Sequence, residues 1–496
     1  MGGSATALRV ENITSLPRFA LRPVGAVVLV QAIMLTALSG RYGFHRDEMY
    51  FVASGDHLAW GYVDNPPITP FLAKAATFFF GDTPMGLRVV ATLAGVLTVI
   101  AAALIARELG GGAAAQALAG AATALSTEVL ALSHMVSTTS VDTVMWVVLG
   151  LLTVRLLRTG DGRWWVAIGA AAGVGMANKW LVLLLVAAIG VGLLATGPRA
   201  VLRSGWLALG VLVALVLVAP LIVWQATHGF PMLTVAGGIS DKDGTENRIM
   251  FVPMQVVYLS PVLVPVWLAG LVRLWRDRRY RALAVSYPLI CAILLVMGGK
   301  PYYSVPLLVV LMAAGAEPAV RWLRTRARRV AAAVAGVVAV VISVLVALPV
   351  LPPSALGPVL AVNKEQGEQV GWPELVTTIS GVWQQLPAEQ RETAVIFTGN
   401  YGQASAINVY GADAGLPGAY SGHMSYADWG PPPDAMTGPV VLVGPHGGGP
   451  FVGCRQAAVN DNGAGVDNEE QGTWISLCDG TTGPWSQIWP QLRHYY

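Results

Sequence analysis

The chain has 496 residues, of which 54% are hydrophobic and 12% are charged, and its formal net charge at pH 7 is +3. Soluble globular proteins carry about 25% charged residues. Together with repeated apolar runs of about 18 residues or more, this composition predicts a multi-pass membrane protein and excludes an ordinary soluble domain. The small, dispersed positive charge does not favour nucleic acid as a partner, and we expect none.

The N-terminal segment carries Arg9, Arg18 and Arg22 and leads into the first apolar run. No small-residue cleavage site lies at a suitable place after that run, so we expect an uncleaved first membrane span rather than a signal peptide. Apolar runs recur up to about residue 350 and predict a mainly α-helical fold with about 11 transmembrane helices. The expected spans are 23–40, 85–107, 113–132, 139–157, 164–178, 181–196, 204–226, 252–272, 282–297, 303–320 and 330–350.

Arginine and lysine fall on opposite sides of these spans. If the N-terminus is cytoplasmic, the arginine-rich loops all lie on the cytoplasmic side, as the positive-inside rule requires. The abundance of Arg, Ala, Gly and Val favours a bacterial protein, so we expect it in a bacterial plasma membrane. The lysines fall on the outer side, where a positive charge needs a local reason such as an anionic ligand. They are Lys74, Lys179, Lys242, Lys300 and Lys364.

The first outer loop, residues 41–84, is too long and too apolar to be a plain linker. Helical spacing runs from Arg46 to Trp60, and Pro66-Pro67 opens a second apolar segment that continues to Phe80. Proline is tolerated in a first helical turn. These patterns predict two amphipathic helices that lie in the outer membrane interface.

The character of the chain changes at about residue 351, where the apolar runs shorten to strand length. Strands are expected at 393–397 and 440–443 and a helix at 373–386. We therefore divide the chain into a membrane module, 1–350, and a small extracytoplasmic α/β domain, 351–496. A disulfide between Cys454 and Cys478 is plausible if this domain faces an oxidising compartment.

Residues that could carry chemistry gather on the predicted outer side. Asp47 and Glu48 are adjacent, so on a helix their side chains point about 100° apart and cannot share one task. From this stretch alone, it stays open that the charges of the loop are only solvated. The other polar places lie at the ends of spans and contain His134, Asp142, Lys179, Lys300 and Tyr302.

Asp142 would lie about one turn inside a span, where an unpaired carboxylate is costly. The alternative interpretation of Asp142 is a residue at a helix start whose polar groups are hydrogen-bonded by neighbouring hydroxyl groups. For Lys179 and Lys300 the alternative is a side chain that extends to the membrane–water interface. Together, a carboxylate that can accept a proton and ammonium groups that can hold an anion predict a site for a lipid-phosphate donor and a hydroxyl acceptor. We predict no protein metal site and no certain cofactor, while a divalent cation stays an open alternative.

Several motifs follow one another in a consistent order: 46–50 (RDEMY), 61–67 (GYVDNPP), 107–111 (RELGG), 178–179 (NK), 224–229 (WQATHG) and 298–303 (GGKPYY). With these motifs the chain resembles the GT-C class of membrane glycosyltransferases. The similarity is to the bacterial family-39-like and aminoarabinose-transferase-like branch, which is related to protein O-mannosyltransferases. It covers about residues 20–320, and the C-terminal motifs 399–404 (GNYGQA) and 421–423 (SGH) also look like that branch.

The resemblance implies a polyprenyl-phosphate-linked sugar as donor and an inverting transfer of a hexosyl or pentosyl group on the outer face. Asp47 would be the general base. The position of the acceptor or of the base would depend on Glu48, Asp142 and His134, and the donor phosphate would be bound by Lys179, Lys300, Arg46 and Tyr302. The acceptor stays open among glycan, lipid, protein and small molecule.

One residue departs from the branch. Aminoarabinose transferases carry Lys directly before the Pro-Pro pair, where this chain has Asn65, so the donor sugar need not be aminoarabinose. A transporter or flippase of a lipid-linked glycan is the alternative function, but it would favour inverted repeats, and we find none. A non-catalytic relative that binds envelope glycan is a third interpretation, which Asp47, Lys179 and Lys300 argue against.

Overall fold

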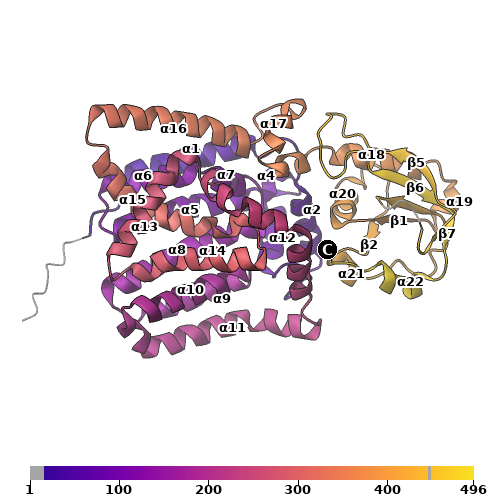
Figure 1. Ribbon diagram of the computed structural model, residues 1–496. Helices are drawn as coiled ribbons and strands as arrows, with labels where there is room; N and C mark the ends of the chain where they lie inside the picture. Colours follow the sequence, from indigo (N-terminus) through magenta and orange to yellow (C-terminus); the bar gives the residue numbers. More distant parts are fainter. Residues whose placement is uncertain (1–15, 445–447, 496) are drawn as a thin grey trace, which may run out of the picture.

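The computed structural model describes residues 16–444 and 448–495, so Arg9 lies outside the described residues. A bundle of long helices forms the larger part, and a small domain with a central sheet lies at one end of it (Figure 1). The predicted fold class, mainly α with a small C-terminal α/β domain, is confirmed.

Ten of the eleven predicted spans correspond to apolar helices or to pairs of them, and the exception is 252–272. The bundle contains α1 (Leu21–Leu38), α4 (Pro84–Leu87), α5 (Val89–Glu108), α6 (Ala113–Ala124), α7 (Thr127–His134), α8 (Thr138–Thr159), α9 (Trp164–Met176), α10 (Leu181–Thr196), α11 (Gly205–Thr227), α12 (Pro231–Val257), α13 (Val264–Arg276), α14 (Arg281–Met297), α15 (Val305–Trp322) and α16 (Arg326–Ala347).

The number of helices that cross a membrane is not settled by their lengths. Within the described ranges, six helices are long and apolar enough to cross, or eight if each of two bent pairs forms one span. α9, α10 and α14 are apolar but shorter. A 13-residue helix such as α9 is about 20 Å long, against about 30 Å of hydrocarbon. The expected count of about 11 stays a prediction.

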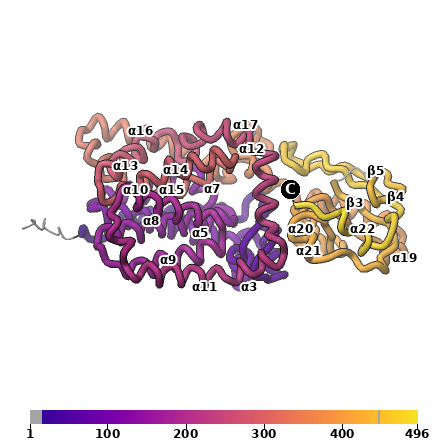
Figure 2. Tube along the Cα trace, turned by 60° about the horizontal axis from the view of Figure 1, so that its bottom comes forward, coloured from indigo at the N-terminus to yellow at the C-terminus, as the bar shows by residue number. Residues whose placement is uncertain are grey.

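The expected loop 227–251 and the expected span 252–272 are wrong as drawn. Residues Pro231–Val257 form one helix, α12, and the chain then bends by 71° before α13. Ser260 has a positive φ of 91° and Pro261 has no N–H to continue a helix, so the break falls inside the expected span. Figures 1 and 2 show α12 across the end of the bundle, between the other helices and the C-terminal domain.

The segment 41–84 folds into the two expected helices, α2 (Arg46–Asp56) and α3 (Ile68–Phe80). α2 begins with a capping box: the Glu48 carboxylate accepts from the His45 N–H at 2.9 Å, and His45 Nδ1 accepts from the Asp47 N–H at 3.1 Å. α3 exposes Phe71, Phe78, Phe79 and Phe80. This pattern fits an interfacial helix with an apolar outer face.

The C-terminal domain is built on a five-stranded mixed sheet in the order β2-β1-β3-β6-β5. β1 (Val395–Thr398) pairs in parallel with β2 (Ala419–Ser421) and β3 (Val440–Val443), while β6 (Trp474–Cys478) runs antiparallel to β3 and to β5 (Arg455–Val459). β4 (Phe451–Val452) and β7 (Gly480–Thr481) form a separate pair, and a disulfide joins Cys454 to Cys478.

Alternate residues of the central strands face two different cores. Val395 and Phe397 pack with α22 (Trp485–Leu492), whereas Ile396 packs with α18 (Trp372–Trp383) and α20 (Tyr401–Tyr410). The second core continues into the membrane module, because it also contains Met49 and Tyr50 of α2. The C-terminal domain is therefore packed onto α2.

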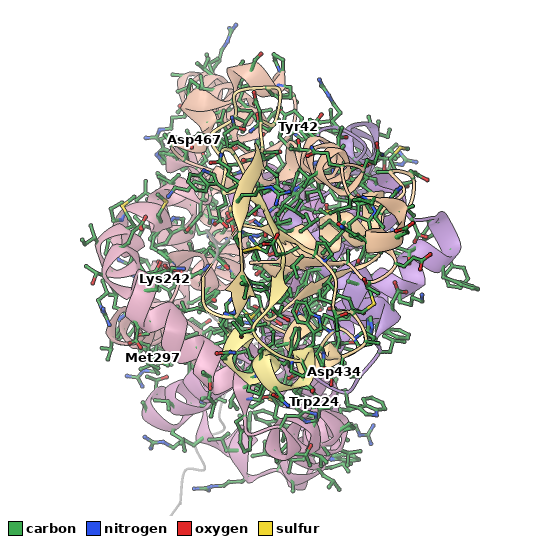
Figure 3. The ribbon with its side chains drawn as sticks, turned by 90° about the vertical axis from the view of Figure 1, so that its right-hand side faces the viewer. Tyr42, Trp224, Lys242, Met297, Asp434 and Asp467 are labelled. Carbon is green, nitrogen blue, oxygen red and sulfur yellow. A yellow bond between two sulfur atoms is a disulfide. The ribbon has the colours of Figure 1, made fainter. Side chains whose placement is uncertain are left out.

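Short elements complete the described chain: η1 (Arg199–Arg203), η2 (Pro261–Leu263), η3 (Pro301–Ser304), η4 (Pro353–Ala355), α17 (Gly357–Leu360), η5 (Lys364–Gln369), α19 (Ala388–Arg391) and α21 (Tyr426–Trp429). Viewed from the C-terminal domain (Figure 3), the sheet stands before the middle of the bundle, while Lys242 and Met297 lie beside it.

Candidate active site

Asp47 lies in the first turn of α2, where the bundle meets the C-terminal domain. Its side chain is 36% exposed, and its Oδ1 accepts a 2.7 Å hydrogen bond from the Tyr401 hydroxyl. Arg46 Nε is 3.7 Å from the same oxygen. An exposed carboxylate held by one neutral donor retains lone pairs with which it can accept a proton from a substrate.

Glu48 points away from Asp47, as adjacent helical residues must. Its carboxylate is fully buried and forms an ion pair with Arg88, with Oε2 2.8 Å from Nη2, and its Oε1 accepts from the Val136 N–H at 2.9 Å. His134 is also buried, with Nε2 3.4 Å from Arg88 Nη1. Such burial is compatible with a role in positioning α2, but not with direct contact to an acceptor.

Lys179 lies in the turn between α9 and α10. Its Nζ donates to Thr139 Oγ1 at 2.7 Å, and the preceding residue, Asn178, ties the turn to Thr69 and to the Thr138 carbonyl. Burial lowers the pKa of Lys179, and it is acted on by the charges of Asp142, Lys300, Glu128 and Asp47, in that order of strength.

Asp142 is buried in α8 and accepts a 3.0 Å hydrogen bond from Trp146 Nε1. Because the charges of Asp142 and Lys179 attract one another, the carboxylate compensates for the buried ammonium group.

Lys300 opens the last segment of the site, ahead of η3. Within residues 16–444 and 448–495 its ammonium group forms no hydrogen bond or ion pair, although the side chain is partly buried. The ammonium group of Lys179 lies over the Tyr302 and Tyr303 rings, with Nζ 5.6 Å and 4.8 Å from their centroids. A partly buried ammonium group that forms no hydrogen bond or ion pair within the described residues can bind an anion.

Arg46, expected at the donor phosphate, is already held by carboxylates. Its Nη1 forms an ion pair with Glu469 and lies 3.9 Å from Glu368, both on the C-terminal side of the chain. Its guanidinium also lies over the Tyr401 ring, 5.7 Å from the centroid. These contacts join α2 to the C-terminal domain, and they leave little free charge for a phosphate.

Two acidic residues of the site were not among the expected site residues. Asp64 accepts from the Tyr50 hydroxyl at 2.7 Å, and burial raises its pKa to about 6. Glu365 lies 2.9 Å from His45 Nε2 and its side chain is 54% exposed. Desolvation alone would raise the pKa of Glu365, but the hydrogen bond to His45 and the charges of His45, Arg46 and Lys300 lower it to about 2.

Asp64 lies inside the motif 61–67 (GYVDNPP), so the motif could have indicated it as a candidate site residue. Glu365 follows the last helix of the bundle in a polar stretch with no motif, and only the fold brings it to His45. No group of three or more His, Cys, Asp or Glu side chains in the described parts of the chain could hold a metal ion.

The chain is similar to known proteins in sequence over one segment and in fold over most of its length. Residues 64–224 match the family model described as dolichyl-phosphate-mannose-protein mannosyltransferase. No curated protein sequence is a significant match to the chain. The fold is that of the GT-C membrane glycosyltransferases.

Within that class the structures similar to this chain include ArnT. ArnT from Cupriavidus metallidurans in the apo state has a TM-score of 0.58 at 15% identity, over 92% of this chain and 97% of that chain. The same protein bound to undecaprenyl phosphate has a TM-score of 0.57 at 17% identity, with the same coverage. Arabinofuranosyltransferase AftD from Mycobacteria has a TM-score of 0.53 at 14% identity, over 93% of this chain and 40% of that chain. The predicted resemblance to the ArnT-like branch is confirmed.

Proposed function

We propose that this protein is an integral membrane glycosyltransferase that moves a hexosyl or pentosyl group from a polyprenyl phosphate to a hydroxyl acceptor. The observation that carries the proposal is the placement of Asp47, Lys179 and Lys300. Asp47 is an exposed carboxylate, and the ammonium group of Lys179 lies 4.8 Å from the centroid of the Tyr303 ring, in the segment that Lys300 opens. The similarity in fold to an ArnT bound to undecaprenyl phosphate supports a lipid-linked donor.

In this proposal Asp47 is the general base. One of its carboxylate oxygens accepts the proton of the acceptor hydroxyl as the acceptor oxygen forms a bond to the anomeric carbon. The bond from that carbon to the phosphate oxygen breaks, and its electron pair stays on the phosphate. Lys300 and Lys179 bind the phosphate and stabilise its growing charge. A single displacement of this kind inverts the anomeric carbon.

We place the protein in a bacterial plasma membrane with a cytoplasmic N-terminus and an extracytoplasmic C-terminal domain. The Cys454–Cys478 disulfide supports this orientation, because disulfides persist in oxidising compartments. The acceptor belongs to one of four classes, glycan, lipid, protein or small molecule.

The test compares Asp47→Asn with the matched variant Asp56→Asn, which changes a solvated carboxylate at the other end of α2. Purified protein in lipid is offered a panel of polyprenyl-phosphate sugars with a crude envelope fraction as acceptor, and released polyprenyl phosphate is followed by mass spectrometry. We expect Asp47→Asn to lose release by at least about 100-fold and Asp56→Asn to keep it.

Near-normal release by a folded Asp47→Asn variant would show that Asp47 is not the base. Failure of the wild type to release lipid phosphate from any donor would instead favour a transporter or flippase of a lipid-linked glycan.

A further inference from the structure

The C-terminal motif 399–404 has no part in the chemistry described so far, yet its first helical residue touches the proposed base. Tyr401 opens α20 and donates its hydroxyl hydrogen to Asp47 Oδ1 at 2.7 Å. The two residues are 354 positions apart in the chain. We propose that Tyr401 is a positioning residue that orients the carboxylate of Asp47, so that the C-terminal domain completes the active site. This inference rests on the proposed function of Asp47.

The Tyr401 ring is fixed from both sides. One face lies against Tyr50 of α2, with ring centroids 4.6 Å apart, and the ring also lies 5.2 Å from His423. The Arg46 guanidinium lies over the ring at 5.7 Å. These contacts restrict the movement of the ring and therefore restrict the position of its hydroxyl group. Such a fixed donor restricts the carboxylate without neutralising it.

Each residue of the motif contributes to this placement. Asn400 caps α20, since its Oδ1 accepts from the Gln403 N–H at 2.9 Å, and both side chains donate to the buried Glu470. Ala404 packs in the core shared with α2. These contacts fix the first turn of α20 to the segment that precedes β6 and to the core shared with α2, and hence hold Tyr401 against α2.

Gly402 has a separate reason to be glycine. A Cβ at this position would lie 2.6 Å from Cγ and 2.9 Å from Cδ of Arg46. The Arg46 side chain crosses α20 at this point on its way to Glu469 and Glu368. A larger residue at this position would have to displace the Arg46 side chain. Within the motif, Gly402 leaves space for the Arg46 side chain and Tyr401 supplies the hydroxyl that donates to Asp47.

The main test is Tyr401→Phe, which removes the hydroxyl and keeps the ring. We expect kcat for polyprenyl-phosphate release to fall on the order of 10- to 100-fold, because the base is no longer held in its productive orientation. KM for the donor should change by less than about threefold, since the phosphate-binding lysines are untouched. The thermal midpoint should stay close to that of the wild type.

The control is Tyr420→Phe in β2 of the same domain, whose hydroxyl has no hydrogen-bond partner among the described residues. It should keep wild-type kcat. A second pair of variants tests the contact between α20 and Arg46. Gly402→Ala should lower kcat, because the added methyl group displaces Arg46. Gly381→Ala in α18 should leave kcat unchanged, because no atom lies within 4 Å of the added Cβ.

The outcomes separate the two proposals. If Asp47→Asn is inactive while Tyr401→Phe has wild-type kcat, Tyr401 does not position the base, and the proposed function stands. If Tyr401→Phe loses activity only in proportion to a loss of folded protein, its role is structural and the inference is wrong. If the wild type releases lipid phosphate from no donor, both proposals are wrong.

Discussion

Lys300 differs from the other cations of the site in that its ammonium group forms no hydrogen bond or ion pair within the described residues. Arg46 forms an ion pair with Glu469, and Lys179 donates a hydrogen bond to Thr139. Lys300, in contrast, interacts with Glu365 only through its charge. An anionic ligand should therefore interact most strongly with this ammonium group.

We expect Lys300→Met to raise KM for the polyprenyl-phosphate donor by about 10- to 100-fold, because one charge-assisted hydrogen bond is worth about 1.5–3 kcal/mol. The matched variant is Lys74→Met, which removes an exposed lysine of α3 that pairs with Asp56. Steady-state kinetics with varied donor would measure both. An unchanged KM in Lys300→Met would remove Lys300 from the donor site.

Asp64 makes folding depend on pH in a defined direction. Burial raises its pKa from 3.8 to about 6. Between about pH 4 and pH 6 the folded protein keeps a proton that the unfolded chain has lost, so stability should fall as the pH rises through this window. The thermal midpoint measured across it should fall less in Asp64→Asn than in the wild type. Equal slopes for the two proteins would contradict the shift.

Sequence reasoning reached Asp47, Lys179 and Lys300 because a charged residue beside a membrane span has few ordinary explanations. The resemblance implied a base at Asp47 and a positioning residue at Glu48, but no pattern in the sequence pointed to a partner for Glu48. The role of Glu48 follows from its ion pair with Arg88, which lies 40 positions further along the chain. An isolated arginine at the start of an apolar run does not indicate its partner. Removing one member of such a buried pair costs about 3–5 kcal/mol, so Glu48 is essential for a structural reason.

At the scale of elements, the helices of the bundle approach one another at glycine. A Cβ on Gly192 of α10 would lie 2.6 Å from the Ala282 carbonyl oxygen of α14, and one on Gly169 of α9 would lie 1.9 Å from the Gly210 carbonyl oxygen of α11. Small residues at such crossings let helix backbones pack closely in a membrane.

We expect Gly192→Ala to destabilise the protein by about 1–3 kcal/mol, because the added methyl group overlaps a backbone carbonyl. Gly190→Ala lies on the same helix and meets no atom within 4 Å, so it should be neutral or slightly stabilising. Thermal unfolding in detergent would compare the two variants. Equal midpoints would mean that α10 and α14 can shift apart without cost.

Element boundaries were predictable where an apolar run had clear ends. The two helices of segment 41–84, the helix near residue 373 and the strands near residues 395 and 440 were found from spacing alone. α12 was missed because its middle is polar, and hydropathy does not distinguish a polar interfacial helix from a loop.

At the scale of the whole molecule, the arginine-rich turns and the C-terminal domain lie at opposite ends of the proposed topology. In a Cys291→Ala background, Asp413→Cys in the C-terminal domain should react with a membrane-impermeant maleimide in intact cells. Arg326→Cys at the start of α16 should react only after the cells are permeabilised. Both positions are exposed, so access across the membrane decides the result, and the reverse labelling pattern would invert the topology.

The contact between Asp47 and Tyr401 also has a consequence for biosynthesis. Asp47 is synthesised among the first tenth of the chain, but its partner follows 354 residues later. In the proposed topology Tyr401 must also be exported and folded against α2. A nascent or truncated chain would hold lipid-linked sugar without a correctly oriented base, so a costly activated donor would be spared until synthesis is finished.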